Sequence, residues 1–130
     1  MAQDGRDLTM TNQENGAVIL PDLLKLTDAA LPAVRTVLDK ARDSVRAMVV
    51  DGDRVSNALI EANQTAAHGL AWLATYVQSL EQMQAWATRL LADGKFGEIE
   101  QLIHQIAFGE YLHQIAGGIP MNQGEILRLQ

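Results

Sequence analysis

The hydrophobic residues of the chain recur with the 3.6-residue period of helices from about residue 21 onward. Strict alternation and β-branched runs, which would indicate strands, are nearly absent. The pattern predicts a short helix from Pro21 or Asp22 to about Ala30, and a second helix from Pro32 to about Val50. The apolar stripe of this second helix consists of Val34, Val37, Leu38, Ala41, Val45 and Met48.

A much longer helix is predicted from Arg54 to Ala92, because no proline interrupts the apolar period there. The turn Asp51-Gly52-Asp53 precedes it, with Asp53 as the expected cap. A seven-residue repeat marks its core seam, which consists of Leu59, Ala66, Leu73, Leu80 and Ala87, joined by Ala62, Leu70, Val77, Met83, Leu90 and Leu91.

The length of this helix creates a geometric problem. It would span roughly 58 Å, whereas a compact domain of this size has a radius of gyration of about 14 Å. We therefore expect either a bend near His68-Gly69 or an overhang that packs on something outside the chain.

A final main helix is predicted from about Glu98 to Ala116, ended by Gly117-Gly118 and Pro120. Beyond this stop, Asn122 and Glu125 have the spacing of a helix-capping pair, which predicts the start of a further helix that is cut off at Gln130. We therefore expect a parent protein that continues. The expected core face of the final main helix consists of Ile99, Leu102, Ile103, Ile106, Leu112 or His113, and Ile115.

Together these patterns predict an all-α fold, an up-and-down antiparallel helical bundle with one long central helix at about 54–92. The expected organisation is a flexible N-terminal tail over 1–20, a bundle domain over 21–118, and the start of a connection to a missing downstream domain over 119–130.

Composition narrows the function classes. The net charge of −6 and the pI near 4.9 argue against a nucleic-acid partner, which requires a basic face. The absence of cysteine excludes disulfides and thiolate chemistry and fits a cytoplasmic location. The amino terminus lacks a secretory signal, and no apolar run reaches about 18 residues, so no membrane association is expected.

Charged residues of the second helix, Arg35, Asp39, Arg42, Asp43 and Arg46, are spaced so that opposite charges meet three or four positions apart. We interpret them as a solvated, charge-paired face; the alternative is an anion site.

Catalytic and metal signals are weak. Glu110 and His113 form one Glu-x-x-His pair, but a ferritin-like metal site needs a second pair and two further glutamates. A partly buried hydrogen-bonding pair is the favoured interpretation. His68 and His104 stand apart from any triad partner, and nucleotide and hydrolase glycine motifs are absent.

Trp72, Tyr76 and Trp86 lie on roughly one side of the long helix, a little off its seam. They are the candidate interface residues, since tryptophan and tyrosine are enriched among interface anchors. The alternative, weighed evenly, is that they cover the edge of the bundle's own core.

The segment HGLAWLATYVQSLEQMQAWATRL, followed by FGEIEQLIHQIAFGEYLHQIAGGIPMNQGEILRL, resembles the region before the flavin domain of proteobacterial FAD-dependent acyl-CoA dehydrogenases of the methylsuccinyl-CoA dehydrogenase type. The resemblance covers about 66–129 and is most distinctive over 108–125. It implies a parent enzyme that uses FAD to oxidise a branched acyl-CoA, such as methylsuccinyl-CoA, to the 2,3-enoyl-CoA, with electrons passing to an electron-transferring flavoprotein.

In that family the catalytic glutamate and the flavin contacts belong to the downstream domain, so the resemblance assigns no catalytic, cofactor-binding or metal residue to this chain. It implies a structural or interface role, with the downstream dehydrogenase domain or a second copy as the expected partner. The first alternative is a free-standing helical interaction module that forms a homodimer. A ferritin-like metal protein ranks third.

Overall fold

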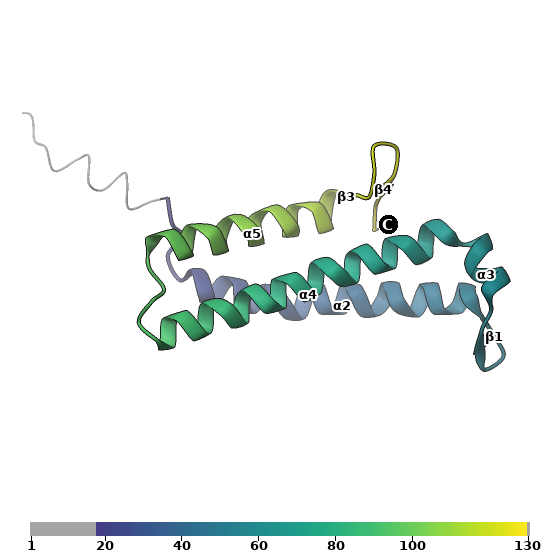
Figure 1. The fold of residues 1–130 in the computed structure, drawn as a ribbon, viewed down its shortest axis with the longest axis horizontal. Coiled ribbons are helices and arrows are strands. Elements are labelled where there is room, and N and C mark those ends of the chain that lie inside the picture. The colour runs from purple at the N-terminus through teal and green to yellow at the C-terminus, as the bar shows by residue number, and fades with distance from the viewer. Residues whose placement is uncertain (1–17, 130) are drawn as a thin grey trace, which may run out of the picture.

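The computed structural model describes residues 18–129. Its main body consists of α2 (Leu23–Val49), α4 (Gln64–Ala92) and α5 (Glu98–Gly117), which alternate in direction along the bundle (Figure 1). The predicted all-α, up-and-down architecture is confirmed. The predicted flexible tail falls, for residues 1–17, outside the described residues. Residues 18–20 lie beside α5, where the Gln105 side chain bonds the Val18 carbonyl and the Leu20 amide.

The two helices predicted before Val50 are a single helix, α2, which continues through Pro32. Proline ends many helices because its ring removes one N–H and clashes with the carbonyl four residues earlier. Pro32 and Asp28, the residue four positions back, are both exposed, so the disturbed carbonyl lies on the solvent side of α2. Buried neighbours such as Thr27 and Val34 hold the helix together across the proline.

The predicted long helix is interrupted at Asn63, whereas α4 continues through Gly69, where a bend was expected. A two-residue hairpin, β1 (Val50–Asp51) with β2 (Arg54–Val55), precedes the short helix α3 (Asn57–Ala62). The cap of α3 is Ser56, not Asp53, because the Ser56 side chain accepts a hydrogen bond from the Leu59 amide.

Asn63 fixes the break between α3 and α4. Its backbone lies outside the helical region, at φ −122° and ψ 34°, and its amide group donates to the Leu59 carbonyl at 2.9 Å. The break leaves α4 with 29 residues beside the 27 residues of α2. At 1.5 Å per residue these are about 44 and 40 Å long. The expected overhang is therefore wrong, because α4 exceeds the helix it packs against by only two residues, about 3 Å.

The core lies where α2, α4 and α5 meet. The core position predicted for the α4 seam is confirmed for four of its residues, Leu73, Val77, Leu80 and Ala87, which are buried. Leu91, also predicted in the seam, is exposed. The α2 stripe contributes Val34 to the buried cluster and Val37, Leu38 and Ala41 around it, while Met48 is exposed. The remaining members of the cluster are Tyr76, Phe108, Ile115 and Ile119.

The predicted core face of α5 is largely wrong. Ile99, Ile103 and Ile106 are 69%, 49% and 66% exposed. The prediction is confirmed for Ile115, which is buried. His104 and Phe108, which were not predicted, are buried with it on the opposite side of a 3.6-residue helix. We call Ile99, Ile103 and Ile106 the outer face of α5. Both sides of the first half of α5 are apolar, so periodicity alone cannot identify the buried one.

The helix predicted to begin near Asn122 is also wrong. β3 (Ile119–Pro120) pairs with β4 (Ile126–Leu127) in an antiparallel hairpin after α5 ends at Gly117. Asn122 and Glu125 do bond to each other at 2.9 Å, but within the turn of this hairpin, where Asn122 also accepts from the Gly124 amide. The same pair of side chains can close a turn or cap a helix.

Among residues 18–129, none of the helices combines the length and the apolar character needed to cross a membrane.

Candidate interface

Trp72 and Tyr76 belong to an aromatic row along the contact between α4 and α5. Trp72 is half-buried and donates a hydrogen bond to the His68 imidazole at 2.8 Å. Tyr76 is buried, and its ring stacks on Tyr111 of α5 with centroids 4.2 Å apart.

The Tyr76 hydroxyl donates a hydrogen bond to Gln114, which in turn donates one to Glu110. Burial raises the pKa of the Tyr76 hydroxyl, with smaller contributions from Tyr111 and Glu110.

Trp86 is separated from this row and begins a second one. Its indole packs edge-on against Phe96, which packs against His104. Trp86 also lines an open groove of about 530 Å³ between α4 and α5, together with Met83, Ala107 and Tyr111. The three candidate residues therefore share one side of α4, but only Trp72 and Trp86 remain partly accessible, and Tyr76 is a core residue.

A buried polar cluster joins the three long helices of residues 18–129. The Thr27 hydroxyl of α2 lies 2.7 Å from Gln84 Oε1 of α4 and 3.1 Å from His104 Nε2 of α5. A hydroxyl carries one proton, so the set is satisfied when Thr27 donates to Gln84 and accepts from a protonated Nε2 of neutral His104. The Gln84 amide donates to the Leu24 carbonyl at 3.1 Å.

His104 is fully buried, and its second ring nitrogen, Nδ1, has no hydrogen-bond partner of normal geometry. Burial lowers the pKa of His104, and a weaker contact with the Met83 backbone opposes this shift. The neutral form of the imidazole is thus favoured, and its complete burial suits a packing role. The sequence carries a signal for this cluster that the pattern analysis missed, since Gln84 occupies the core register seven residues after Val77.

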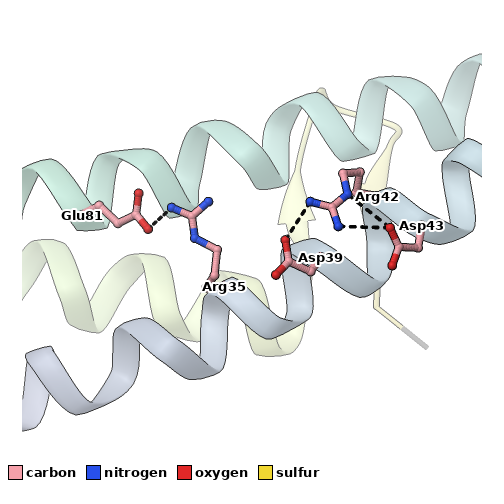
Figure 2. Close-up of polar contacts among 5 residues, drawn as sticks. All are labelled: Arg35, Asp39, Arg42, Asp43 and Glu81. Carbon is pink, nitrogen blue, oxygen red and sulfur yellow. Dashed lines mark hydrogen bonds and ion pairs between the residues drawn. The ribbon is translucent and has the colours of Figure 1, made fainter.

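The charged residues of α2 form ion pairs, as Figure 2 shows. Arg42 contacts Asp39 at 3.0 Å and Asp43 at 3.1 Å, which confirms local pairing on a solvated face. Arg35 reaches across to Glu81 of α4 instead of pairing within its own helix. Because carboxylates already neutralise Arg35 and Arg42, an anion site at these residues is disfavoured.

Glu110 and His113 are both exposed on α5, so the predicted burial of this pair is wrong, and the Glu110 carboxylate accepts a hydrogen bond from Gln114. Over residues 18–129, no three acidic or histidine side chains come together in a group that could hold a metal ion.

Gly69 is the place where the C-terminal hairpin contacts the bundle. Leu127 of β4 lies over Gly69 of α4, so closely that a Cβ at this position would be 2.7 Å from Leu127 Cδ1. The adjoining groove is lined by residues of α2, α4 and the hairpin, among them Ala41, Leu73 and Leu129. Gly69 thus provides close packing for Leu127 within a continuous helix.

The sequence of this chain is related to that of a known dehydrogenase. The chain is 54% identical over 115 residues to a (2S)-methylsuccinyl-CoA dehydrogenase from Cereibacter sphaeroides. The chain is therefore homologous to part of an acyl-CoA dehydrogenase. The match covers 88% of this chain, well beyond the half that carried the resemblance, and 21% of the relative. The chain thus spans about a fifth of the length of the curated relative it matches. No family model matches the chain.

The acyl-CoA dehydrogenase relationship gives a context for the residues described above. The buried histidine serves packing, the ion pairs are superficial, and the aromatic rows join α4 to α5. Apolar surface remains at the α4–α5 groove and on the outer face of α5. A surface for contact with protein is the function class that this arrangement favours.

Proposed function

We propose that this chain is the non-catalytic N-terminal helical part of a cytoplasmic, FAD-dependent acyl-CoA dehydrogenase, with a structural or interface role beside the dehydrogenase domain. The observation that carries the proposal is the 54% identity to a (2S)-methylsuccinyl-CoA dehydrogenase, of which the chain covers 21%. The parent enzyme would use FAD, held in its dehydrogenase domain, to oxidise a branched acyl-CoA such as methylsuccinyl-CoA to the 2,3-enoyl-CoA.

The side chains of the described residues favour a structural role over a catalytic one. The buried polar side chains Thr27, Gln84 and His104 bond to one another between the helices. The groove beside Trp86 is mainly apolar, whereas a flavin dinucleotide requires several donors for its diphosphate. This groove therefore does not fit an FAD, and we derive no catalytic step from residues 18–129.

The test compares the 130-residue chain with the full product of its gene. The purified 130-residue chain is expected to be colourless and to leave methylsuccinyl-CoA unchanged. The full product is expected to show flavin absorbance and to reduce an electron-transferring flavoprotein when methylsuccinyl-CoA is added. A 130-residue chain that binds FAD, or a full product without flavin, would contradict the proposal.

The homodimer alternative has one specific observation in its favour, the exposed isoleucines of α5. Sedimentation of the 130-residue chain over a range of concentrations separates the two candidates. A concentration-independent monomer supports the dehydrogenase appendage, and a dimer that dissociates on dilution supports the free-standing module.

A further inference from the structure

The outer face of α5 is an apolar surface on a helix whose other side is already in the core. Ile99, Ile103 and Ile106 succeed one another at intervals of four and three residues, so they form one stripe along α5. Opposite them, His104, Phe108 and Ile115 are buried against α2 and α4. Exposed aliphatic side chains that gather in one stripe mark a candidate contact site. Among the described residues, α2, α4 and residues 18–20 contact α5, and the three isoleucines stay exposed (Figure 1).

The stripe continues into the α4–α5 groove. Ala107, which lines that groove with Met83, Trp86 and Tyr111, lies one helical turn after Ile103. Arg89 stands at the groove and Glu110 follows Ile106 by one turn, so charged groups border the apolar surface. An apolar centre with an aromatic anchor and a charged border is the usual anatomy of a protein interface. We call the stripe and the groove together the α5 docking surface.

The size of this surface favours a covalently connected partner over a second copy. A patch of a few aliphatic side chains is on the order of a few hundred Å², while a stable complex of separate chains buries about 800 Å² on each partner. A partner in the same polypeptide needs less buried area, because the linker already holds it at a high effective concentration. About four fifths of the length of the curated relative lies outside the matched segment, so such a partner is available there.

We propose that the α5 docking surface packs against the dehydrogenase portion of the same polypeptide in the full-length protein. This assignment rests on the proposed function and adds to it the surface that makes the contact. Trp86, one of the three interface residues predicted from sequence, lies in this surface, whereas Tyr76 stays in the core of the bundle. The additional anchors are Ile99, Ile103 and Ile106, which the spacing of apolar residues predicted to lie in the core.

The test measures thiol accessibility, which is practical because the 130-residue chain contains no cysteine. Ile103→Cys places a thiol at the centre of the stripe, and Lys40→Cys places a control thiol at an exposed position of α2. The alkylation rate of each is followed by mass spectrometry of its own peptide, in the 130-residue chain and in the full-length protein. Circular dichroism verifies folding, and Ile106→Cys serves as the second stripe variant if Ile103→Cys does not fold.

In the full-length protein, the thiol at position 103 is expected to react at least about tenfold more slowly than in the 130-residue chain. The reason is that the thiol reacts only while the interface is open, and an interface open for about a tenth of the time lowers the alkylation rate about tenfold. The control thiol at position 40 is expected to react equally in both. Equal rates at position 103, in a full-length protein that retains flavin and activity, would overturn this assignment and leave the proposed function intact.

Two further outcomes would overturn the assignment for other reasons. Protection of position 103 that grows with the concentration of the 130-residue chain would identify a second copy as the occupant. A full gene product without flavin would overturn the proposed function and, with it, the assignment that rests on it.

Discussion

Both sides of α5 carry apolar side chains, but the two sides have opposite environments. The inner side places His104 and Phe108 between α2 and α4, at 0% and 2% exposure. The outer side leaves Ile99 and Ile106 more than half exposed. Hydrophobicity alone therefore does not decide which side of a helix enters the core of a domain; the available neighbours decide it. The inner side also carries the His104 imidazole, which bonds to Thr27 of α2, whereas the outer side presents the aliphatic groups of Ile99, Ile103 and Ile106.

The largest expected difference between the two sides concerns truncation to alanine. Phe108→Ala removes a ring that is buried in the cluster of α2, α4 and α5, and it should lower the free energy of unfolding by about 3–5 kcal/mol. Ile106→Ala, two residues earlier on the outer face, should change it by less than about 0.5 kcal/mol in the 130-residue chain. Urea denaturation of the two variants measures both values. Comparable losses would show that the outer face is covered within this chain.

A second difference concerns the polar partners of the inner side. Thr27→Val keeps the shape of the side chain and removes the hydroxyl that connects Gln84 and His104. Two buried groups then lose a partner, and the expected loss is about 1–3 kcal/mol. Thr36→Val is the matched control, since the exposed Thr36 hydroxyl bonds only to the Pro32 carbonyl of its own helix. Equal effects of the two variants in urea denaturation would contradict a role for the cluster in stability.

The helical architecture is predictable from the sequence because the repeated apolar positions of α2 and α4 each have only one apolar side. Leu73, Val77 and Leu80 enter the core as their spacing predicts. The interruption at Asn63 is not predictable in the same way, because asparagine stops a helix only when its side chain finds local carbonyl groups. Pro32 shows the converse, a strong local breaker that the surrounding packing overrides.

The candidate site is less predictable for a related reason. Spacing places Trp72, Tyr76 and Trp86 on one side of α4, which the structure confirms, but it does not reveal that Tyr76 stacks on Tyr111. That contact depends on the position of α5, which depends in turn on which of its two apolar sides is buried. Asn122 and Glu125 illustrate the same limit, since their mutual bond closes a turn of the hairpin that Leu127 attaches over Gly69.

The smallest expected difference between the two sides of α5 is a dependence on pH. Burial lowers the pKa of His104 below its ordinary value of about 6.5. The unfolded chain therefore binds a proton that the folded chain resists, and stability is full above pH 6.5 and falls as the pH drops below it. The slope from this one group is at most about 1.4 kcal/mol per pH unit.

His113 provides the matched control, because it lies on the exposed part of the same helix. Urea denaturation between about pH 7.5 and 5.5, above the range where most carboxylates titrate, should show the decline in the wild type and in His113→Gln. The decline should be absent in His104→Gln, whose side chain is uncharged throughout this range. If His104→Gln lost stability on acidification as steeply as the wild type, protonation of His104 would not be the cause of the decline. That result would refute the electrostatic contrast between the two sides of α5 and would leave their difference in packing intact.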